Sequence, residues 1–153
     1  IGNASTLKVV TNYLASVHLY SLGEALIICK KYGLDLKTAY QGIKISSGNS
    51  FVHETESKVI LSGSYNVNFT MDLACKDLGL FNQLTKKYNV PTEISPLMLR
   101  IFNKARKKIG DRGWSTKIVK LLEEECNIDL RSKGFPLKLK DDKPRKKGIE
   151  VKF

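Results

Sequence analysis

The sequence predicts an all-α protein: a helical bundle around one long central helix, with an extended basic tail. Residues 5–31 contain no proline and carry apolar side chains around most of the helix circumference, which is typical of a buried helix. Further segments with helical periodicity follow, and no segment alternates apolar and polar residues as a strand does. After Leu130 glycine, proline and charged residues dominate. We therefore expect residues 131–153 to be extended or disordered.

The central helix is expected to begin near Asn3 or Ser5, either of which can cap it, and to end at Gly33. At a rise of about 1.5 Å per residue it spans on the order of 40 Å, so other helices should wrap around it. Those helices are expected at residues 36–45, 52–61, 67–88, 93–109 and 116–126. Asp35 and Ser115 are the expected caps of the second and the sixth helix.

Composition restricts the class of protein. The cysteines, Cys29, Cys75 and Cys126, are scattered and form no Cys-x-x-Cys pair, which favours reduced thiols in a cytoplasmic protein. His18 and His53 do not stand at metal-ligand spacing, so no metal site is expected. No apolar run reaches the roughly 18 residues that a membrane span needs, so no membrane partner is expected either.

The formal net charge of +11 raises the question of nucleic acid binding. Residues 131–153 contribute +6 of it, and a second basic cluster lies within residues 104–112. Neither cluster is interleaved with aromatic residues on which bases could stack, so a solvated basic surface is the favoured interpretation. A non-enzymatic helical module that binds nucleic acid through its basic tail is the alternative.

Lys8 and Asn12 are the first candidate site. They stand four residues apart and therefore lie on one face of the central helix, where both can address one small ligand. An ammonium group embedded among apolar neighbours has a lowered pKa, which suits proton transfer near neutral pH. The alternative is a surface lysine beside an asparagine at a domain edge.

Lys76 and Asp77 are the second candidate site. They follow Phe69 by seven and eight residues, two helical turns along an apolar stripe. Charges in line with an apolar stripe are unusual unless they are paired, solvated or used in function. A local ion pair at the edge of the core is the alternative.

Three short stretches and one phenylalanine resemble the 3-hydroxyisobutyrate dehydrogenase (β-hydroxyacid dehydrogenase) family. Residues 2–12 resemble its Gly-x-Gly-x-x-x-Lys-x-x-x-Asn motif, with Ala4 in place of the second glycine. Residues 76–80 match its Lys-Asp-Leu-x-Leu motif at the right separation. Residues 46–48 match its Ser-Ser-Gly loop, and Phe69 stands where the family has a phenylalanine. The resemblance covers about residues 2–130.

The resemblance implies a two-domain enzyme that uses NAD or NADP. Residues 1–130 correspond to a helical C-terminal domain of the 6-phosphogluconate dehydrogenase type, which closes over the nicotinamide and forms a homodimer or higher homo-oligomer. The family's N-terminal Rossmann domain binds the dinucleotide, and this chain has no Gly-x-Gly-x-x-Gly after a strand. The chain alone is therefore expected to be inactive.

The resemblance also assigns roles. Lys8 corresponds to the catalytic acid/base; Asn12, Phe69 and Asp77 correspond to substrate-binding residues, and Lys76 to a residue near the cofactor. The expected substrate is a small β-hydroxyacid such as 3-hydroxyisobutyrate, which is oxidised, or its semialdehyde, which is reduced. The sequence does not indicate which hydroxyacid is used, or whether NAD or NADP.

Overall fold

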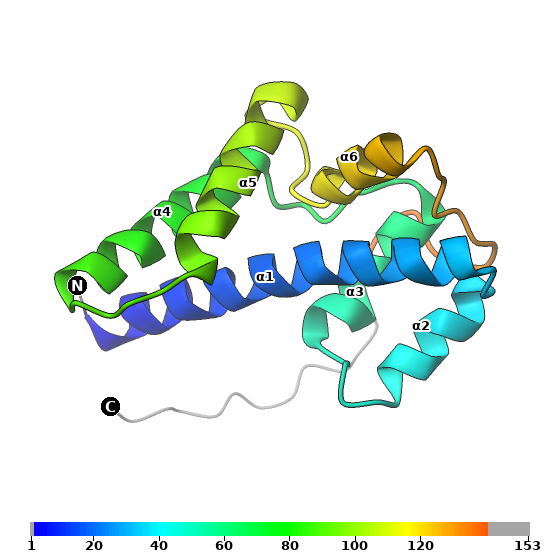
Figure 1. Ribbon diagram of the computed structural model, residues 1–153, viewed down its shortest axis with the longest axis horizontal. Coiled ribbons are helices and arrows are strands. Elements are labelled where there is room, and N and C mark those ends of the chain that lie inside the picture. Colours follow the sequence, from blue (N-terminus) through cyan, green and yellow to red (C-terminus); the bar gives the residue numbers. More distant parts are fainter. Residues whose placement is uncertain (1, 141–153) are drawn as a thin grey trace.

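The computed structural model describes residues 2–140, which form six α-helices (Figure 1). The helices are α1 (Asn3–Tyr32), α2 (Leu36–Lys44), α3 (Phe51–Ser62), α4 (Met71–Lys87), α5 (Ile94–Ile109) and α6 (Lys117–Cys126). Over the described range no strand forms, and the β-pairing is confined to an isolated bridge between Thr70 and Trp114. The predicted all-α class is confirmed. None of these helices is both long and apolar enough to cross a membrane.

α1 is the axis of the fold, as predicted. It runs unbroken for 30 residues; α4 and α5 lie along its N-terminal half, and α2, α3 and α6 surround its C-terminal half (Figure 1). Gly23 allows α6 to approach closely, because a Cβ at this position would lie 2.9 Å from Cγ2 of Val119.

α1 is buried along one face only, and here the expectation of a helix buried all round was wrong. Its buried residues are Ser16, Leu19, Leu22, Gly23, Leu26 and Ile27. Leu14 and Ile28 are 45% and 67% exposed. They lie on the side of α1 that the other described helices leave uncovered.

The start of α1 also differs from the expectation. Gly2 occupies the N-cap position with an extended backbone and no side-chain cap, so Asn3 and Ser5 lie inside the first turn and cap nothing. The end agrees with the sequence: Gly33 adopts a left-handed φ of 92° and closes the helix onto the carbonyls of Cys29 and Lys30.

Of the two other predicted caps, one is confirmed. The Asp35 side chain accepts a hydrogen bond from the Thr38 amide at 2.8 Å. Ser115 does not cap α6, because that helix begins two residues later with Thr116 at its N-cap position. The Thr116 hydroxyl instead donates to the carbonyl oxygen of Tyr65, which ties the start of α6 to the loop after α3.

α4 begins at Met71, four residues later than predicted. Asn68 has a left-handed φ of 58°, which interrupts the helical periodicity read from the sequence. The next residues pair with another segment: the carbonyl of Phe69 accepts from the Ser115 amide at 2.9 Å, and the Met71 amide donates to the carbonyl of Gly113 at 2.8 Å. Phe69 is thus held by main-chain pairing rather than by a helix.

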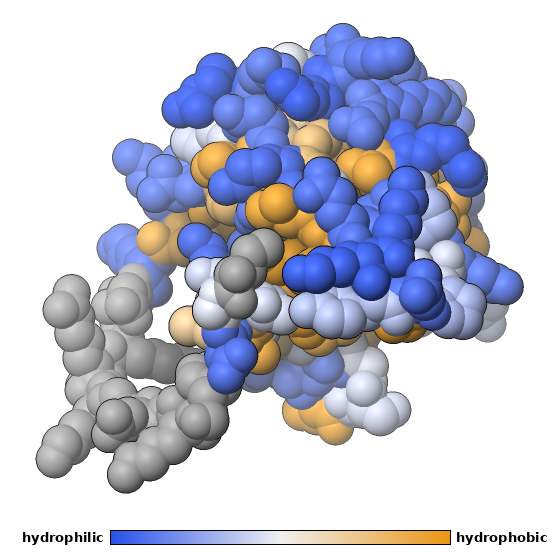
Figure 2. All heavy atoms as spheres, turned by 90° about the vertical axis from the view of Figure 1, so that its left-hand side faces the viewer, coloured by the Kyte–Doolittle hydropathy of each residue, from blue (hydrophilic) through white to orange (hydrophobic). Residues whose placement is uncertain are grey.

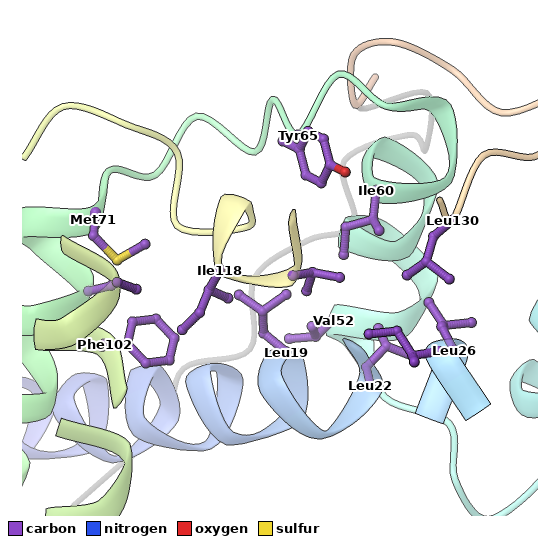
Figure 3. Close-up of a cluster of buried hydrophobic side chains, with 14 of the residues drawn as sticks. Leu19, Leu22, Leu26, Val52, Ile60, Tyr65, Met71, Phe102, Ile118 and Leu130 are labelled. Atoms are coloured by element: carbon purple, nitrogen blue, oxygen red, sulfur yellow. The ribbon is translucent and has the colours of Figure 1, made fainter. Parts of the chain in front are cut away.

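The core lies between α1 and the helices above and below it. Figure 3 shows Leu19, Leu22 and Leu26 pointing from α1 toward side chains of the other elements. Those partners include Val52, Ile60, Phe102, Ile118 and Leu130. Leu130 is fully buried, so the core extends past α6 to the residue just before the expected basic tail.

The first tail residues are attached to this body. Arg131 lies 2.5 Å from a carboxylate oxygen of Glu123, donates to the Tyr65 hydroxyl and to the carbonyl of Ile60, and lies over the Tyr65 ring. Phe135 packs edge-on against Tyr40 with ring centroids 5.2 Å apart. No helix forms in residues 131–140. The expectation for residues 141–153 lies outside the described residues.

Candidate active site

Asn12 and Asp77 join the two motifs that the sequence separates by 65 residues. The Asn12 side-chain amide donates to Asp77 Oδ2 at 2.6 Å, which links α1 to α4. Asp77 is only 7% exposed, and its Oδ1 lies 3.5 Å from the Lys76 ammonium. A buried carboxylate needs such partners, because an unpaired one is strongly destabilising. The local ion pair considered from the sequence is present, and it holds the carboxylate that anchors Asn12.

An aromatic pair next to this bond fixes the spacing of the two helices. Tyr13 of α1 and Phe81 of α4 stack with ring centroids 3.8 Å apart and 5° between their planes. Tyr13 follows Asn12 by one position, and Phe81 follows Asp77 by four. The stack therefore supports the geometry of the Asn12–Asp77 hydrogen bond.

Lys8 lies one helical turn before Asn12, about 6 Å along the axis of α1. Its side chain is exposed, and among the residues described no carboxylate forms an ion pair with it. The expectation of an ammonium embedded among apolar groups was therefore wrong for this chain, because none of the described elements covers the face of α1 that carries Lys8. The lysine is free to reach a molecule bound beside Asn12.

Phe69 and Asn12 line the same cavity, which has a volume of about 150 Å³. The other lining residues are Ala15, Ser16, Leu19, Glu56, Ala74, Phe102 and Ser115. Phe69 and Asn12 thus share one cavity, and the substrate-binding role that the resemblance assigns to Phe69 stays a prediction. Asp77 is not among the lining residues and contacts the site through its hydrogen bond with Asn12. The side chain of Lys76 is 60% exposed.

Glu56 is the acidic residue in the lining of this cavity, and the sequence analysis did not single it out. Its side chain is partly buried, and its Oε2 is shielded from solvent and has no hydrogen-bond partner among residues 2–140. Burial raises the pKa of the Glu56 carboxyl from the usual 4.5 to about 7. No sequence signal marks it, because it stands in α3 among residues of ordinary helical pattern and matches none of the motifs.

The stability of the fold should therefore depend on the ionisation of Glu56. The pKa of Glu56 is higher in the folded protein than in the unfolded chain. Below about pH 4.5 the carboxyl is protonated in both states, so the stability of the fold is unaffected. As pH rises through about 7 the buried carboxyl must ionise, and stability is lost. Glu56→Gln removes this loss. Above pH 8 the variant should be more stable than the wild type by about 1–3 kcal/mol, a gap that closes at pH 4.5.

Urea unfolding of both proteins across that pH range measures the difference, in which the contributions of all other groups cancel. A constant difference between pH 4.5 and 8 would show that Glu56 titrates normally.

Comparisons with known proteins identify the family of the chain. The family described as "NAD-binding of NADP-dependent 3-hydroxyisobutyrate dehydrogenase" matches residues 2–122. The 2-(hydroxymethyl)glutarate dehydrogenase of Eubacterium barkeri is 33% identical over 130 residues, which are 84% of this chain and 43% of that protein.

Two solved structures share the fold. The 3-hydroxyisobutyrate dehydrogenase of Salmonella typhimurium has a TM-score of 0.72 at 26% identity, over 78% of this chain and 42% of that one. The structure of Psf3 in complex with NADP+ and 2-OPP has a TM-score of 0.66 at 26% identity, over 79% of this chain and 42% of that one. The chain thus spans about two fifths of the length of the relatives it matches, and it belongs to the family of NAD-binding domains of NADP-dependent 3-hydroxyisobutyrate dehydrogenase.

Proposed function

We propose that this chain is the substrate-binding, helical half of an NAD(P)-dependent dehydrogenase that oxidises a small β-hydroxyacid or reduces the matching semialdehyde. The observation that carries the proposal is the hydrogen bond between Asn12 and Asp77. This bond connects α1 with α4, and Lys8 stands one turn from Asn12 while Lys76 lies beside the carboxylate, which supports a single site built from both motifs. A charge-driven binding module has no reason to hold these four residues together.

Lys8 is the proposed acid/base. In its neutral form it accepts the proton of the substrate hydroxyl as hydride leaves the carbon, and in its protonated form it returns that proton in the reverse direction. Its exposed position on α1 supports this role, because the amine has to meet a substrate that lies between this domain and a second one.

Asn12 is the proposed substrate-orienting residue. Asp77 takes one amide hydrogen of Asn12 and so fixes the side chain, which leaves the amide oxygen and the second hydrogen for a ligand. Phe69 supplies an apolar wall beside it.

The cofactor, NAD or NADP, supplies the hydride acceptor when bound. Lys76 fits a position near its anionic parts, since its side chain is 60% exposed and it is held beside Asp77. We propose that an N-terminal Rossmann domain of the kind implied by the family resemblance binds most of the dinucleotide.

Several apolar side chains of this domain are exposed to solvent, which supports the presence of a second domain or subunit that covers them. Leu7 and Leu14 of α1 and Leu73 of α4 are between 38% and 45% exposed. In Figure 2, apolar side chains lie among hydrophilic ones on the side of the molecule where α1 begins. We propose a second domain and a homodimer or higher homo-oligomer as the partners. The free cysteines support a reducing, cytoplasmic location.

The proposal is tested by NAD(P)H formation when the complete enzyme is mixed with 3-hydroxyisobutyrate or 2-(hydroxymethyl)glutarate and NAD or NADP. Asn12→Ala should raise KM for the hydroxyacid by about 10-fold or more and change kcat less, because the amide orients the substrate but transfers no proton. A variant with unchanged KM would remove Asn12 from the substrate site. Absence of NAD(P)H with every β-hydroxyacid tried would contradict the proposed function.

Nucleic acid binding is the other function raised by the charge. In the structure most of the basic cluster at residues 104–112 is already paired: Lys104 and Lys108 lie near Glu125, and Arg106 lies 2.7 Å from Asp111. Arg112 lies 3.5 Å from Asp72. Binding to duplex DNA that falls steeply with salt, without dehydrogenase activity, would favour this alternative.

A further inference from the structure

The stripe of α1 that carries Lys8 continues into the cavity. Lys8, Asn12, Ser16 and Leu19 follow each other at intervals of four, four and three residues, so they share one face of the helix. Along this stripe the side chains pass from exposed at Lys8, through partly buried at Asn12, to buried at Ser16 and Leu19. Asn12 therefore stands between the proposed acid/base and the cavity.

A ligand held by Asn12 with its reacting hydroxyl toward Lys8 has its other side toward that cavity. In a β-hydroxyacid, the groups on that other side belong to carbon 2, the carbon next to the reacting one. The cavity volume of about 150 Å³ exceeds the roughly 30 Å³ that a water molecule occupies in the liquid, so a substituent of a few heavy atoms fits.

One polar atom in the lining of the cavity, Glu56 Oε2, calls for an occupant that donates a hydrogen bond. Glu56 Oε2 is shielded and has no partner within the described part of the chain, and leaving such an atom unsatisfied costs about 1–3 kcal/mol. The hydroxyl of Ser16 is already committed, since it donates to the carbonyl of Asn12 at 3.0 Å. An occupant that donates a hydrogen bond to Glu56 recovers the lost interaction.

Charge limits the occupant further. Among the residues at positions 2–140 that line the cavity, Glu56 is the only ionisable one, and none is a lysine or an arginine. An anionic substituent would therefore meet a carboxyl group and no compensating cation, whereas a neutral donor or a cation is accepted.

We propose that this cavity is the subsite for the carbon-2 substituent of the substrate, and that Glu56 selects substituents that carry a hydrogen-bond donor, a hydroxyl or an ammonium group. Apolar substituents leave Oε2 unsatisfied, and anionic ones are repelled by the ionised carboxylate. This inference rests on the proposed dehydrogenase function, and it assigns a specificity-determining role to a residue outside the shared motifs.

The test compares substrates that differ only at carbon 2. The series is 3-hydroxyisobutyrate (methyl), 2-(hydroxymethyl)-3-hydroxypropanoate (hydroxymethyl), L-serine (ammonium) and 2-(hydroxymethyl)glutarate (carboxyethyl). With the complete wild-type enzyme, kcat/KM for the hydroxymethyl or the ammonium compound should exceed that for the methyl compound by about 10-fold or more. The carboxyethyl compound should be the poorest substrate.

Variants of Glu56 separate the two donor groups. Glu56→Gln should keep the preference for hydroxymethyl and lose any preference for ammonium, because the amide accepts a hydrogen bond but carries no charge. Glu56→Leu should lose both preferences. Glu24→Gln, an exposed change on α1 away from the cavity, should leave the ratios of the wild type. Equal ratios in the wild type and both Glu56 variants would overturn the inference while leaving the proposed function intact.

A binding measurement decides the case if no compound is turned over or a Glu56 variant does not fold. The carboxyl carbon resonance of Glu56 in labelled wild-type protein should shift on addition of the hydroxymethyl or the ammonium compound and not on addition of the methyl compound. No shift with any of them would overturn the inference whatever the activity.

Discussion

Lys8→Ala is expected to lower kcat of the complete enzyme by about 10²-fold or more and to leave the dissociation constant of the cofactor within a few fold. The amine acts on the proton of the reacting hydroxyl, whereas the dinucleotide is held mainly by the other domain. Lys8→Arg should not restore activity, because a guanidinium group stays protonated and cannot accept that proton. Steady-state kinetics and cofactor titration measure the two effects separately.

Lys30→Ala is the matched control for the loss of a positive charge. Lys30 is also exposed on α1 but lies at the opposite end of the helix. Its replacement should leave kcat near the wild-type value. If Lys8→Ala kept near-normal turnover, the acid/base would have to be another residue, and the family fold would be present without the proposed chemistry.

Arg131→Met is expected to destabilise the fold by on the order of 3 kcal/mol. Glu123 is 6% exposed, and its carboxylate accepts from Arg131, from the Tyr65 hydroxyl and, at 3.2 Å, from the amide of Leu130. Removing the guanidinium leaves this buried carboxylate without its cation. The Tyr65 hydroxyl and the carbonyl of Ile60 also lose a donor.

Chemical unfolding of the variant measures this loss. Lys133→Met changes an exposed cation two residues later and should alter stability by less than about 0.5 kcal/mol. Adding Glu123→Gln to Arg131→Met should recover part of the stability, since a neutral amide is less costly to bury than an unpaired carboxylate. A loss below about 1 kcal/mol for Arg131→Met would show that the network contributes little.

The fold could be predicted from the sequence largely because helix signals are local. Periodicity and the cap at Asp35 identified all six helices of the described residues, and Gly33 identified the end of α1. The failures came from tertiary pairing. α4 starts late because Asn68 is left-handed and Phe69 pairs with Ser115, a partner 46 positions away that no local pattern shows.

The site was predicted only in part, for a similar reason. Spacing put Lys8 and Asn12 on one helix face, and motif resemblance connected them with Lys76 and Asp77. The hydrogen bond between Asn12 and Asp77 is a consequence of how α1 packs on α4. Glu56 was missed because its significance lies in its burial and in an oxygen without a partner, which only the packing of α3 reveals.

Chemical rescue of Lys8→Ala tests the central claim most directly. If Lys8 transfers the proton, added primary alkylamines small enough to enter the space it vacates should raise the turnover of the variant in proportion to their concentration. The second-order rate constants for oxidation of the hydroxyacid should increase with amine basicity, and the wild type should not respond. Turnover of the variant that does not depend on added amine, or that rises equally in the wild type, would contradict the assignment of Lys8 as the acid/base.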